Sequence, residues 1–206
     1  MELYFAPLAC SLASRIVSYE AGIPLSFVQV DTHDQRVVDD GSFFLPINPL
    51  GQVPVMRLGS GELLTENAAI LQYLGRLKPG SGLLGRRDEL HRLQRWLGFV
   101  SSELHKAIFT PLFHGAEPHP IKSLAPDRFD VLVTHLQSRE YLLDGFTVAD
   151  AYLFAVLNWS QAVGIDLAPW PVLLAYRKRL LQRPSVARAL QEEYALYQVE
   201  QERHAA

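Results

Sequence analysis

The chain has 206 residues, of which 49% are hydrophobic and 20% charged, and its formal net charge is −3. This composition gives no support for nucleic-acid binding, which needs an excess of clustered Lys and Arg. No apolar run approaches the roughly 18 residues of a membrane span, and the first residues lack the pattern of a secretory signal. We therefore expect a cytoplasmic protein with neither a nucleic-acid nor a membrane partner.

The cysteine and histidine content argues against disulfides and metal sites. Cys10 is the single cysteine, which excludes an internal disulfide and fits a reducing compartment. The seven histidines show neither zinc-finger nor HExxH spacing. We therefore expect no metal ligands.

The first 78 residues alternate between strand and helix patterns. β-Branched and aromatic runs predict strands, and apolar residues at steps of three and four predict helices. In chain order we expect a strand at 3–5, a helix at 11–21, a strand at 25–30, a mobile polar loop at 31–41, a β-hairpin at 53–64 and a helix at 65–77. This order predicts an α/β domain over residues 1–78.

The rest of the chain shows helical patterns only. Pro79-Gly80-Ser81-Gly82 begins a linker, which we place at 79–86. We then expect a long helix from Leu90 that Pro111 and the segment 115–120 end, further helices at 126–139, 147–163, 170–181 and 184–197, and a fraying tail at 198–206. The second predicted domain, residues 87–206, is all-helical.

Cys10 lies between the first strand and the first helix. There its sulfur would face the N–H groups and the positive dipole end of the helix, which stabilise a thiolate and lower the cysteine pKa. A lone cysteine can equally be a small buried hydrophobic residue. The hydroxyl of Ser11 either caps the helix, which is its more common role, or stabilises a thiolate itself.

Two further segments could bind a ligand. Asn-Pro-Leu-Gly-Gln-Val-Pro at 48–54 either leads into an edge strand or, if the Val53–Pro54 bond is cis, turns the Val53 backbone outward to pair with an extended peptide. Thr65 is predicted to cap the next helix, whose N–H groups would accept a carboxylate. Glu66 either complements the dipole of that helix or helps to hold a ligand with both an ammonium and a carboxylate group.

The helical half contains two polar residues of interest. His105 shares a face of the long helix with Gly98, Ser102 and Phe109, whose small members leave room beside it; a solvated surface histidine is the usual alternative. Thr-Val-Ala-Asp at 147–150 has the spacing of a capping box, so we expect Asp150 to stabilise the fold, by about 1–2 kcal/mol, without a part in chemistry.

Together these motifs resemble the bacterial beta-class glutathione S-transferases. The likeness covers nearly the whole chain in the same order and spacing, through Leu-Tyr-Phe at 3–5, Ala-Cys-Ser-Leu-Ala at 9–13, the motif at 48–54, Leu-Thr-Glu-Asn-Ala-Ala-Ile at 64–70, Glu-Leu-His-Lys at 103–106 and the segment 146–154. The resemblance implies a thioredoxin-like N-terminal domain, an all-helical C-terminal domain, a homodimer and a site at the domain cleft. It also implies glutathione as co-substrate, with no further cofactor.

By the same resemblance, Cys10 and His105 are catalytic and lie near the glutathione sulfur. The backbone of Val53, ahead of a cis Pro54, pairs with the cysteinyl segment. The other residues that it implies for glutathione binding are Ser11, Gln35, Gln52, Glu66, Asn67 and Ser102.

Two positions depart from the family pattern. Relatives often carry a lysine in the loop where this chain has His33-Asp34-Gln35, and an asparagine where it has Gly98. Both changes remove polar contacts. Because a charge-assisted hydrogen bond is worth about 1.5–3 kcal/mol, we expect glutathione to bind more weakly or in a shifted pose.

The predicted reaction is conjugation of the glutathione thiolate to a small hydrophobic electrophile, a detoxification reaction. We expect the electrophile to lie against residues such as Phe109, Phe113 and Trp159 and the chain near Pro111. Two alternatives stay open: a glutathione-dependent thiol–disulfide oxidoreductase in which Cys10 turns over, and a non-catalytic binding protein of the same fold. It also stays open whether Cys10 assists the glutathione thiolate or forms a mixed disulfide with it.

Overall fold

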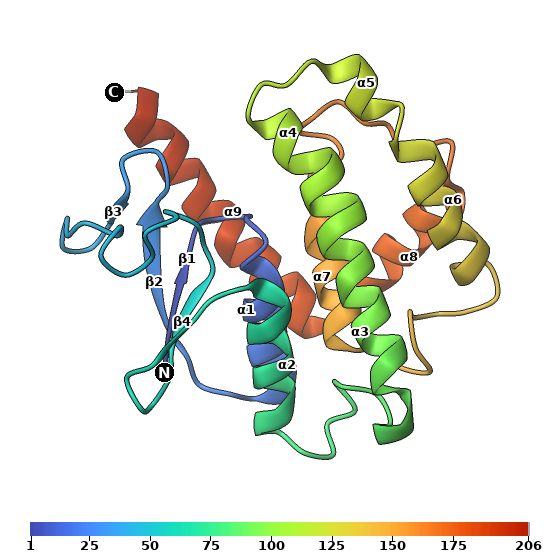
Figure 1. Cartoon of the computed structure of the whole chain (residues 1–206), viewed down its shortest axis with the longest axis horizontal. Coiled ribbons are helices and arrows are strands. Elements are labelled where there is room, and N and C mark those ends of the chain that lie inside the picture. Colours follow the sequence, from blue (N-terminus) through green and yellow to red (C-terminus); the bar gives the residue numbers. More distant parts are fainter. Residues whose placement is uncertain (206) are drawn as a thin grey trace. The chain divides into compact units, whose positions relative to one another are not determined.

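The computed structural model describes residues 1–205 and forms two compact units (Figure 1). The first unit comprises residues 1–79 together with the chain from Pro184 onward, and the second comprises residues 80–183. The C-terminal helix α9 (Pro184–Ala205) therefore groups with the N-terminal residues and not with the helices of the second unit. The predicted fold class, a thioredoxin-like domain and a helical domain, is confirmed.

The first unit is built on a five-stranded mixed sheet. Its order is β3-β2-β1-β4-β5, and the strands are β1 (Glu2–Phe5), β2 (Ser26–Asp31), β3 (Arg36–Val37), β4 (Val55–Arg57) and β5 (Leu63–Leu64). β1 and β2 are parallel, joined by the helix α1 (Leu12–Ala21), and the other pairs are antiparallel. The predicted hairpin is confirmed as β4–β5. The predicted loop at 31–41 was wrong in one respect, because it contains β3, which pairs with β2.

The two faces of this sheet are covered differently. Alternate strand residues point to opposite faces. On one face Tyr4, Val30 and Val55 pack with Phe44 and Val37 into a buried cluster to which the loop before β4 contributes. On the other, α1 packs against α2 (Asn67–Leu77) and α9, and α2 also contacts β4. The elements that carry Cys10 and the residues after Glu66 are thereby fixed against each other.

The predicted fraying of the chain end is wrong for the residues that the structure describes. α9 continues to Ala205, and its last turns are tied to β2. Glu200 accepts a hydrogen bond from Gln29, and Asp31 pairs with Arg203 and His204. A polar tail forms helix here because its charged side chains have partners on the sheet, which sequence periodicity does not show.

The second unit is all helical. After a short 3-10 turn (Arg87–Glu89), its helices are α3 (Leu90–Phe99), the π-helical stretch η2 (Val100–Phe109), α4 (Thr110–Phe113), α5 (Pro118–Lys122), α6 (Ala125–Leu136), α7 (Val148–Leu157) and α8 (Pro171–Leu181). α3, η2 and α4 follow one another as a single long helix (Figure 1). That helix continues past Pro111, the second residue of α4, so the expected end at this proline is wrong. The short helix α5 was not predicted.

α7 is the core of the second unit. All of its residues are buried, and it contacts α3, η2 and α8. Its start is fixed by the predicted capping box: the Asp150 carboxylate accepts hydrogen bonds from the backbone N–H and hydroxyl of Thr147, both at 2.8 Å. The N–H of Leu142 and the hydroxyl of Tyr176 also donate to it, at 2.9 and 2.8 Å. The predicted structural setting of Asp150 is confirmed.

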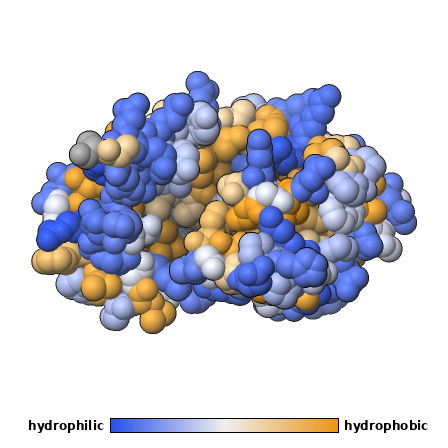
Figure 2. All heavy atoms as spheres, turned by 90° about the horizontal axis from the view of Figure 1, so that it is seen from above, coloured by the Kyte–Doolittle hydropathy of each residue, from blue (hydrophilic) through white to orange (hydrophobic). Residues whose placement is uncertain are grey.

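The face drawn in Figure 2 carries both hydrophilic and hydrophobic areas. In the first unit, Phe43, Leu45 and Leu50 are exposed, and all three lie on the loop between β3 and β4. Among residues 1–205, none of the helices combines the length and the hydropathy that crossing a bilayer requires.

Candidate functional site

Cys10 lies in the turn between β1 and α1, as predicted. It is buried, with 6% of its surface exposed, and α1 begins two residues later at Leu12. The carbonyl of Cys10 accepts a hydrogen bond from the N–H of Ala13, in the first turn of α1, at 3.1 Å. Its thiol donates to the carbonyl of Val53 at 3.5 Å. The sulfur is therefore at the N-terminal end of a helix, and next to the backbone of the segment 48–54.

Ser11 does not cap α1, so the cap predicted for it is wrong. A capping residue has an extended backbone that aims its hydroxyl at the N–H groups of the first turn. The backbone of Ser11 is already helical, with φ −57° and ψ −24°. Its hydroxyl points back and donates to the carbonyl of Ala6 at 3.2 Å. Ser11 therefore closes the turn that carries Cys10.

Asn67 fastens the start of α2 to the same turn. Its side chain is buried; Nδ2 donates to the Cys10 carbonyl at 3.1 Å, and Oδ1 accepts from the Ser14 hydroxyl at 3.1 Å. The cap predicted for Thr65 is wrong, because α2 begins at Asn67 and Glu66 holds the capping position without a side-chain bond. Glu66 is exposed and has φ +64°, a conformation that costs a non-glycine residue free energy and often marks a functional position.

The segment 48–54 approaches Cys10 with a cis Val53–Pro54 bond, as expected. Val53 is half-buried and Pro54 buried, while Gln52 is exposed. The buried Asn48 holds this segment, because its amide donates to the Gln52 carbonyl at 2.7 Å.

Gln35 lies against the same segment. Its amide donates to the carbonyls of Thr32 at 2.7 Å and Gly51 at 3.3 Å. Gly51 has φ +62°, a backbone conformation that favours glycine, and a Cβ added to it would lie 2.4 Å from Gln35 Oε1 and displace that side chain. In the first unit, Val53 and Asn67 therefore contact Cys10 directly and Gln35 contacts the segment 48–54, while Glu66 is the exposed residue next to Asn67.

A buried ion pair also holds the Cys10 turn, and sequence reasoning missed it. The N–H of Leu8, a residue with φ +59°, donates to Glu193 Oε2 at 2.8 Å, and Arg15 Nε donates to Glu193 Oε1 at 2.8 Å. The Arg15 guanidinium lies over the rings of Phe5 and Phe27, at 4.4 and 3.7 Å from their centroids. Burial raises the pKa of Glu193 to about 7, against the opposing charge of Arg15.

His105 belongs to the second unit and is held by aromatic residues. Its Nδ1 lies 2.8 Å from the hydroxyl of the buried Tyr152, and its ring packs edge-on against Trp159 at 4.9 Å. Burial, and then the charge of Lys106, lower the pKa of His105 to about 4. The imidazole is therefore neutral near pH 7, with one ring nitrogen as donor and the other as acceptor.

The aromatic residues predicted near an electrophile do cluster beside His105. The rings of Phe109 and Phe113 pack against Trp159, with centroids 5.7 and 5.6 Å from it. Ser102 is exposed, and its hydroxyl donates to the Gly98 carbonyl at 2.9 Å, within its own helix. A Cβ at Gly98 would meet nothing within 4 Å, so packing does not require glycine there.

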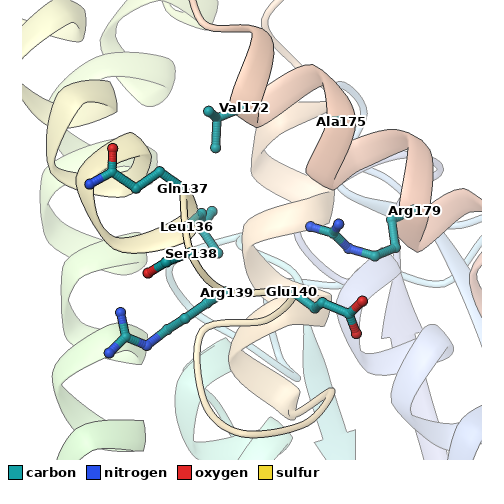
Figure 3. Close-up of a pocket in the computed structure, with 8 residues that line it drawn as sticks. All are labelled: Leu136, Gln137, Ser138, Arg139, Glu140, Val172, Ala175 and Arg179. Atoms are coloured by element: carbon teal, nitrogen blue, oxygen red, sulfur yellow. The ribbon is translucent and has the colours of Figure 1, made fainter.

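A separate pocket of about 340 Å³ lies elsewhere in the second unit (Figure 3). It is lined by Leu136, Gln137, Ser138, Arg139, Glu140, Val172, Ala175 and Arg179, at the end of α6 and along α8. None of the predicted site residues lines it.

Family models match both parts of the chain. Residues 9–77 match "Glutathione S-transferase, N-terminal domain", and residues 124–184 match "Glutathione S-transferase, C-terminal domain". The chain is 38% identical to the glutathione S-transferase GstA of Escherichia coli, with 94% of this chain and 98% of the relative covered. Among solved structures it is similar to BphK, described as a bacterial glutathione S-transferase, in a ternary complex: TM-score 0.87 and 41% identity over 94% and 99% of the two chains.

A second solved structure, the bacterial beta-class enzyme of Sphingomonas chungbukensis, has a TM-score of 0.87 and 42% identity over 94% of this chain and 98% of its own. The chain belongs to the glutathione S-transferase family. Within that family the predicted resemblance to the bacterial beta class is confirmed, and with it a glutathione transferase that uses glutathione as co-substrate.

Proposed function

We propose that the chain joins glutathione to small hydrophobic electrophiles, with Cys10 acting at the glutathione sulfur and His105 assisting it. The observation that carries this proposal is the position of the Cys10 thiol, at the start of α1 and 3.5 Å from the Val53 carbonyl. The positive end of a helix stabilises a negative sulfur. The glutathione thiolate held there attacks the electrophile and forms a carbon–sulfur bond. The leaving group of the electrophile departs with the electron pair of the broken bond.

Glutathione is proposed to bind along the segment 48–54 and the start of α2. The backbone of Val53 pairs with the cysteinyl segment, as an extended peptide pairs with a strand edge. Glu66 and Asn67 hold the γ-glutamyl end, where the dipole of α2 favours the carboxylate and Glu66 the ammonium group. Gln35, Gln52 and Ser102 supply further polar contacts. Ser11 and Pro54 act through the shape of the backbone around Cys10.

His105 is proposed to donate a hydrogen bond to the sulfur. If the Tyr152 hydroxyl donates to Nδ1, the proton of the neutral ring is on Nε2, which is then the donor. Because the pKa of His105 is lowered to about 4, this donor keeps the same protonation state across the neutral pH range. The apolar side chains of Phe109, Phe113 and Trp159 are proposed to receive the electrophile.

We also propose a homodimer that acts in the cytoplasm. The exposed hydrophobic side chains of Phe43, Leu45 and Leu50 support an interface on the loop between β3 and β4, because exposed apolar groups on one segment favour a partner surface. The single cysteine supports a reducing compartment. Sedimentation of the wild type and of a Leu50→Asp variant measures the oligomeric state, and a monomeric wild type would remove the dimer from the proposal.

The test of the reaction compares the wild type with Cys10→Ala on an activated aryl chloride. We expect Cys10→Ala to lower kcat/KM by about 10- to 100-fold, the loss of one charge-assisted hydrogen bond to a thiolate. Intact mass after treatment with oxidised glutathione shows whether Cys10 forms a mixed disulfide. Unchanged conjugation by Cys10→Ala, with disulfide reduction lost, would instead assign Cys10 to oxidoreductase chemistry. A wild type that neither gains thermal stability from millimolar glutathione nor conjugates would contradict the transferase proposal.

A further inference from the structure

Three side chains that can ligate a metal ion meet where the end of β2 approaches the last turns of α9. Asp31 is the last residue of β2, and Glu200 and His204 lie one helical turn apart on α9. One ligand atom from each lies within 4.8 Å of the other two. We propose that this cluster, the Asp31 cluster, binds a divalent transition-metal ion such as Zn²⁺.

The geometry of the Asp31 cluster resembles that of a ligand set. Residues four apart on a helix share a face, so the Glu200 carboxylate and the His204 imidazole point the same way. His204 Nε2 lies 2.7 Å from Asp31 Oδ2. Asp31 and Glu200 are buried, whereas His204 is exposed and gives an ion in solution access to the two carboxylates.

Hydrogen-bond donors outside the cluster orient both carboxylates. Asp31 Oδ1 accepts the backbone N–H groups of His33 at 3.0 Å and Asp34 at 3.3 Å, which leaves Oδ2 directed at His204. Glu200 Oε2 accepts a hydrogen bond from the Gln29 amide at 3.1 Å. Metal ligands are held in this way, by outer-shell groups that fix the orientation of each ligating side chain.

Arg203 would compete with a metal ion for the Asp31 carboxylate. Its Nη2 lies 2.9 Å from Asp31 Oδ2, the same oxygen that faces His204. Two carboxylates buried close together need a positive charge, and Arg203 supplies one. Its side chain is 37% exposed, so it can turn into water when a divalent ion takes over that charge. Binding of the ion therefore releases Arg203 and any proton on His204 Nε2.

The donor atoms select the class of metal. Two carboxylate oxygens and one imidazole nitrogen suit Zn²⁺ and its neighbours in the transition series, whereas Mg²⁺ and Ca²⁺ prefer sets made of oxygen alone. His33 follows β2 closely, and its ring centroid is 5.5 Å from that of His204, so it can supply a further nitrogen. The spacing of residues along the chain does not reveal this site, because Asp31 and His204 are separated by 173 positions.

The test titrates the metal-free full chain with Zn²⁺ in a calorimeter. The background is Cys10→Ala, because a thiol also binds zinc. We expect one ion per chain, and a loss of more than about tenfold in affinity for His204→Ala and for Glu200→Gln, because even outer-shell changes cost about 10- to 100-fold. His119→Ala is the matched control: this exposed histidine of α5 lies outside the cluster, and its variant should bind zinc as the parent does.

Asp31 is buried, so Asp31→Asn can disturb the fold and is not used as the test variant. His204 is exposed, so the melting temperature of metal-free His204→Ala should stay close to that of its parent. Absence of zinc binding at millimolar concentration would overturn the proposal. So would zinc binding that His204→Ala leaves unchanged. Mg²⁺ binding as tight as that of zinc would show an acidic surface that attracts any divalent ion, which also overturns it.

Discussion

Each unit keeps its candidate catalytic residue in place through a buried carboxylate. The two carboxylates differ in how far along the sequence their partners lie. In the second unit Asp150 fixes the start of α7, and α7 carries Tyr152, which contacts His105. In the first unit Glu193 reaches from α9 to the N–H of Leu8, in the turn that carries Cys10. Asp150 binds partners up to 26 positions away, whereas Leu8 is 185 positions from Glu193.

The two carboxylates also differ in what offsets their burial. Asp150 is held by neutral donors: two backbone N–H groups and two hydroxyls. Glu193 has one backbone N–H and the cation of Arg15. Burial raises the pKa of both. Neutral donors within 26 positions therefore hold Asp150 inside the second unit, whereas the ion pair of Glu193 links the Cys10 turn to the end of the chain.

Removal of the Asp150 carboxylate is expected to have the largest effect. Asp150→Ala leaves several buried donors without a partner, each of which costs about 1–3 kcal/mol, so we expect a loss of about 3–5 kcal/mol in the free energy of unfolding. This exceeds the loss expected of a helix cap alone. Denaturant unfolding measures it, with Asp150→Asn, which keeps one oxygen acceptor, as the milder control. A loss below about 1 kcal/mol would mean that the network is not a stability element.

Removal of the Glu193 charge is expected to change how stability depends on pH. The folded-state pKa, about 7, lies above the ordinary value of 4.5, so the folded state holds the proton more tightly than the unfolded state does. The stabilising contribution is therefore complete below pH 4.5 and is lost as the pH rises through 7. At about 1.36 kcal/mol per unit of pKa, the loss is about 3 kcal/mol.

Glu193→Gln cannot ionise, so this component of the pH dependence should be missing from its unfolding free energies between pH 4 and 8. Glu192→Gln is the matched control, since Glu192 is the adjacent residue of α9 and is much less buried. Parallel pH curves for the wild type and Glu193→Gln would remove Glu193 as the titrating group. Conjugation rates of folded Glu193→Gln then report whether the Cys10 turn has moved.

The sequence separation between each carboxylate and its partners also explains which features could be predicted from the sequence. The Asp150 capping box is a pattern four residues long, and the Cys10 turn and the segment 48–54 are short motifs too, so local reading found all of them. Glu193 and the last turns of α9 depend on partners at the other end of the chain, which no periodicity reveals. The cap expected of Ser11 failed for a local reason, because its backbone is already helical and its hydroxyl turns back to Ala6.

The smallest expected effect concerns the hydrogen bond between Tyr152, on α7, and the candidate catalytic residue His105. Tyr152→Phe removes only a hydroxyl, whose bond to His105 Nδ1 is worth about 0.5–1.5 kcal/mol, so we expect kcat/KM for conjugation to fall by about 2- to 10-fold. If the hydroxyl sets the tautomer of His105, the nitrogen that carries the proton should change, which the ¹⁵N chemical shifts of the imidazole report.

Tyr141→Phe is the matched control, because its hydroxyl accepts a bond from Arg183 and makes no contact with His105 among those described. It should leave both the rate and the imidazole shifts unchanged. If Tyr152→Phe lowers stability but leaves the shifts of His105 as they are, Tyr152 supports the helix without selecting the tautomer. In that case α7 would serve the fold alone. Asp150 and Glu193 would then both affect stability, but Asp150 would not affect its candidate catalytic residue, His105.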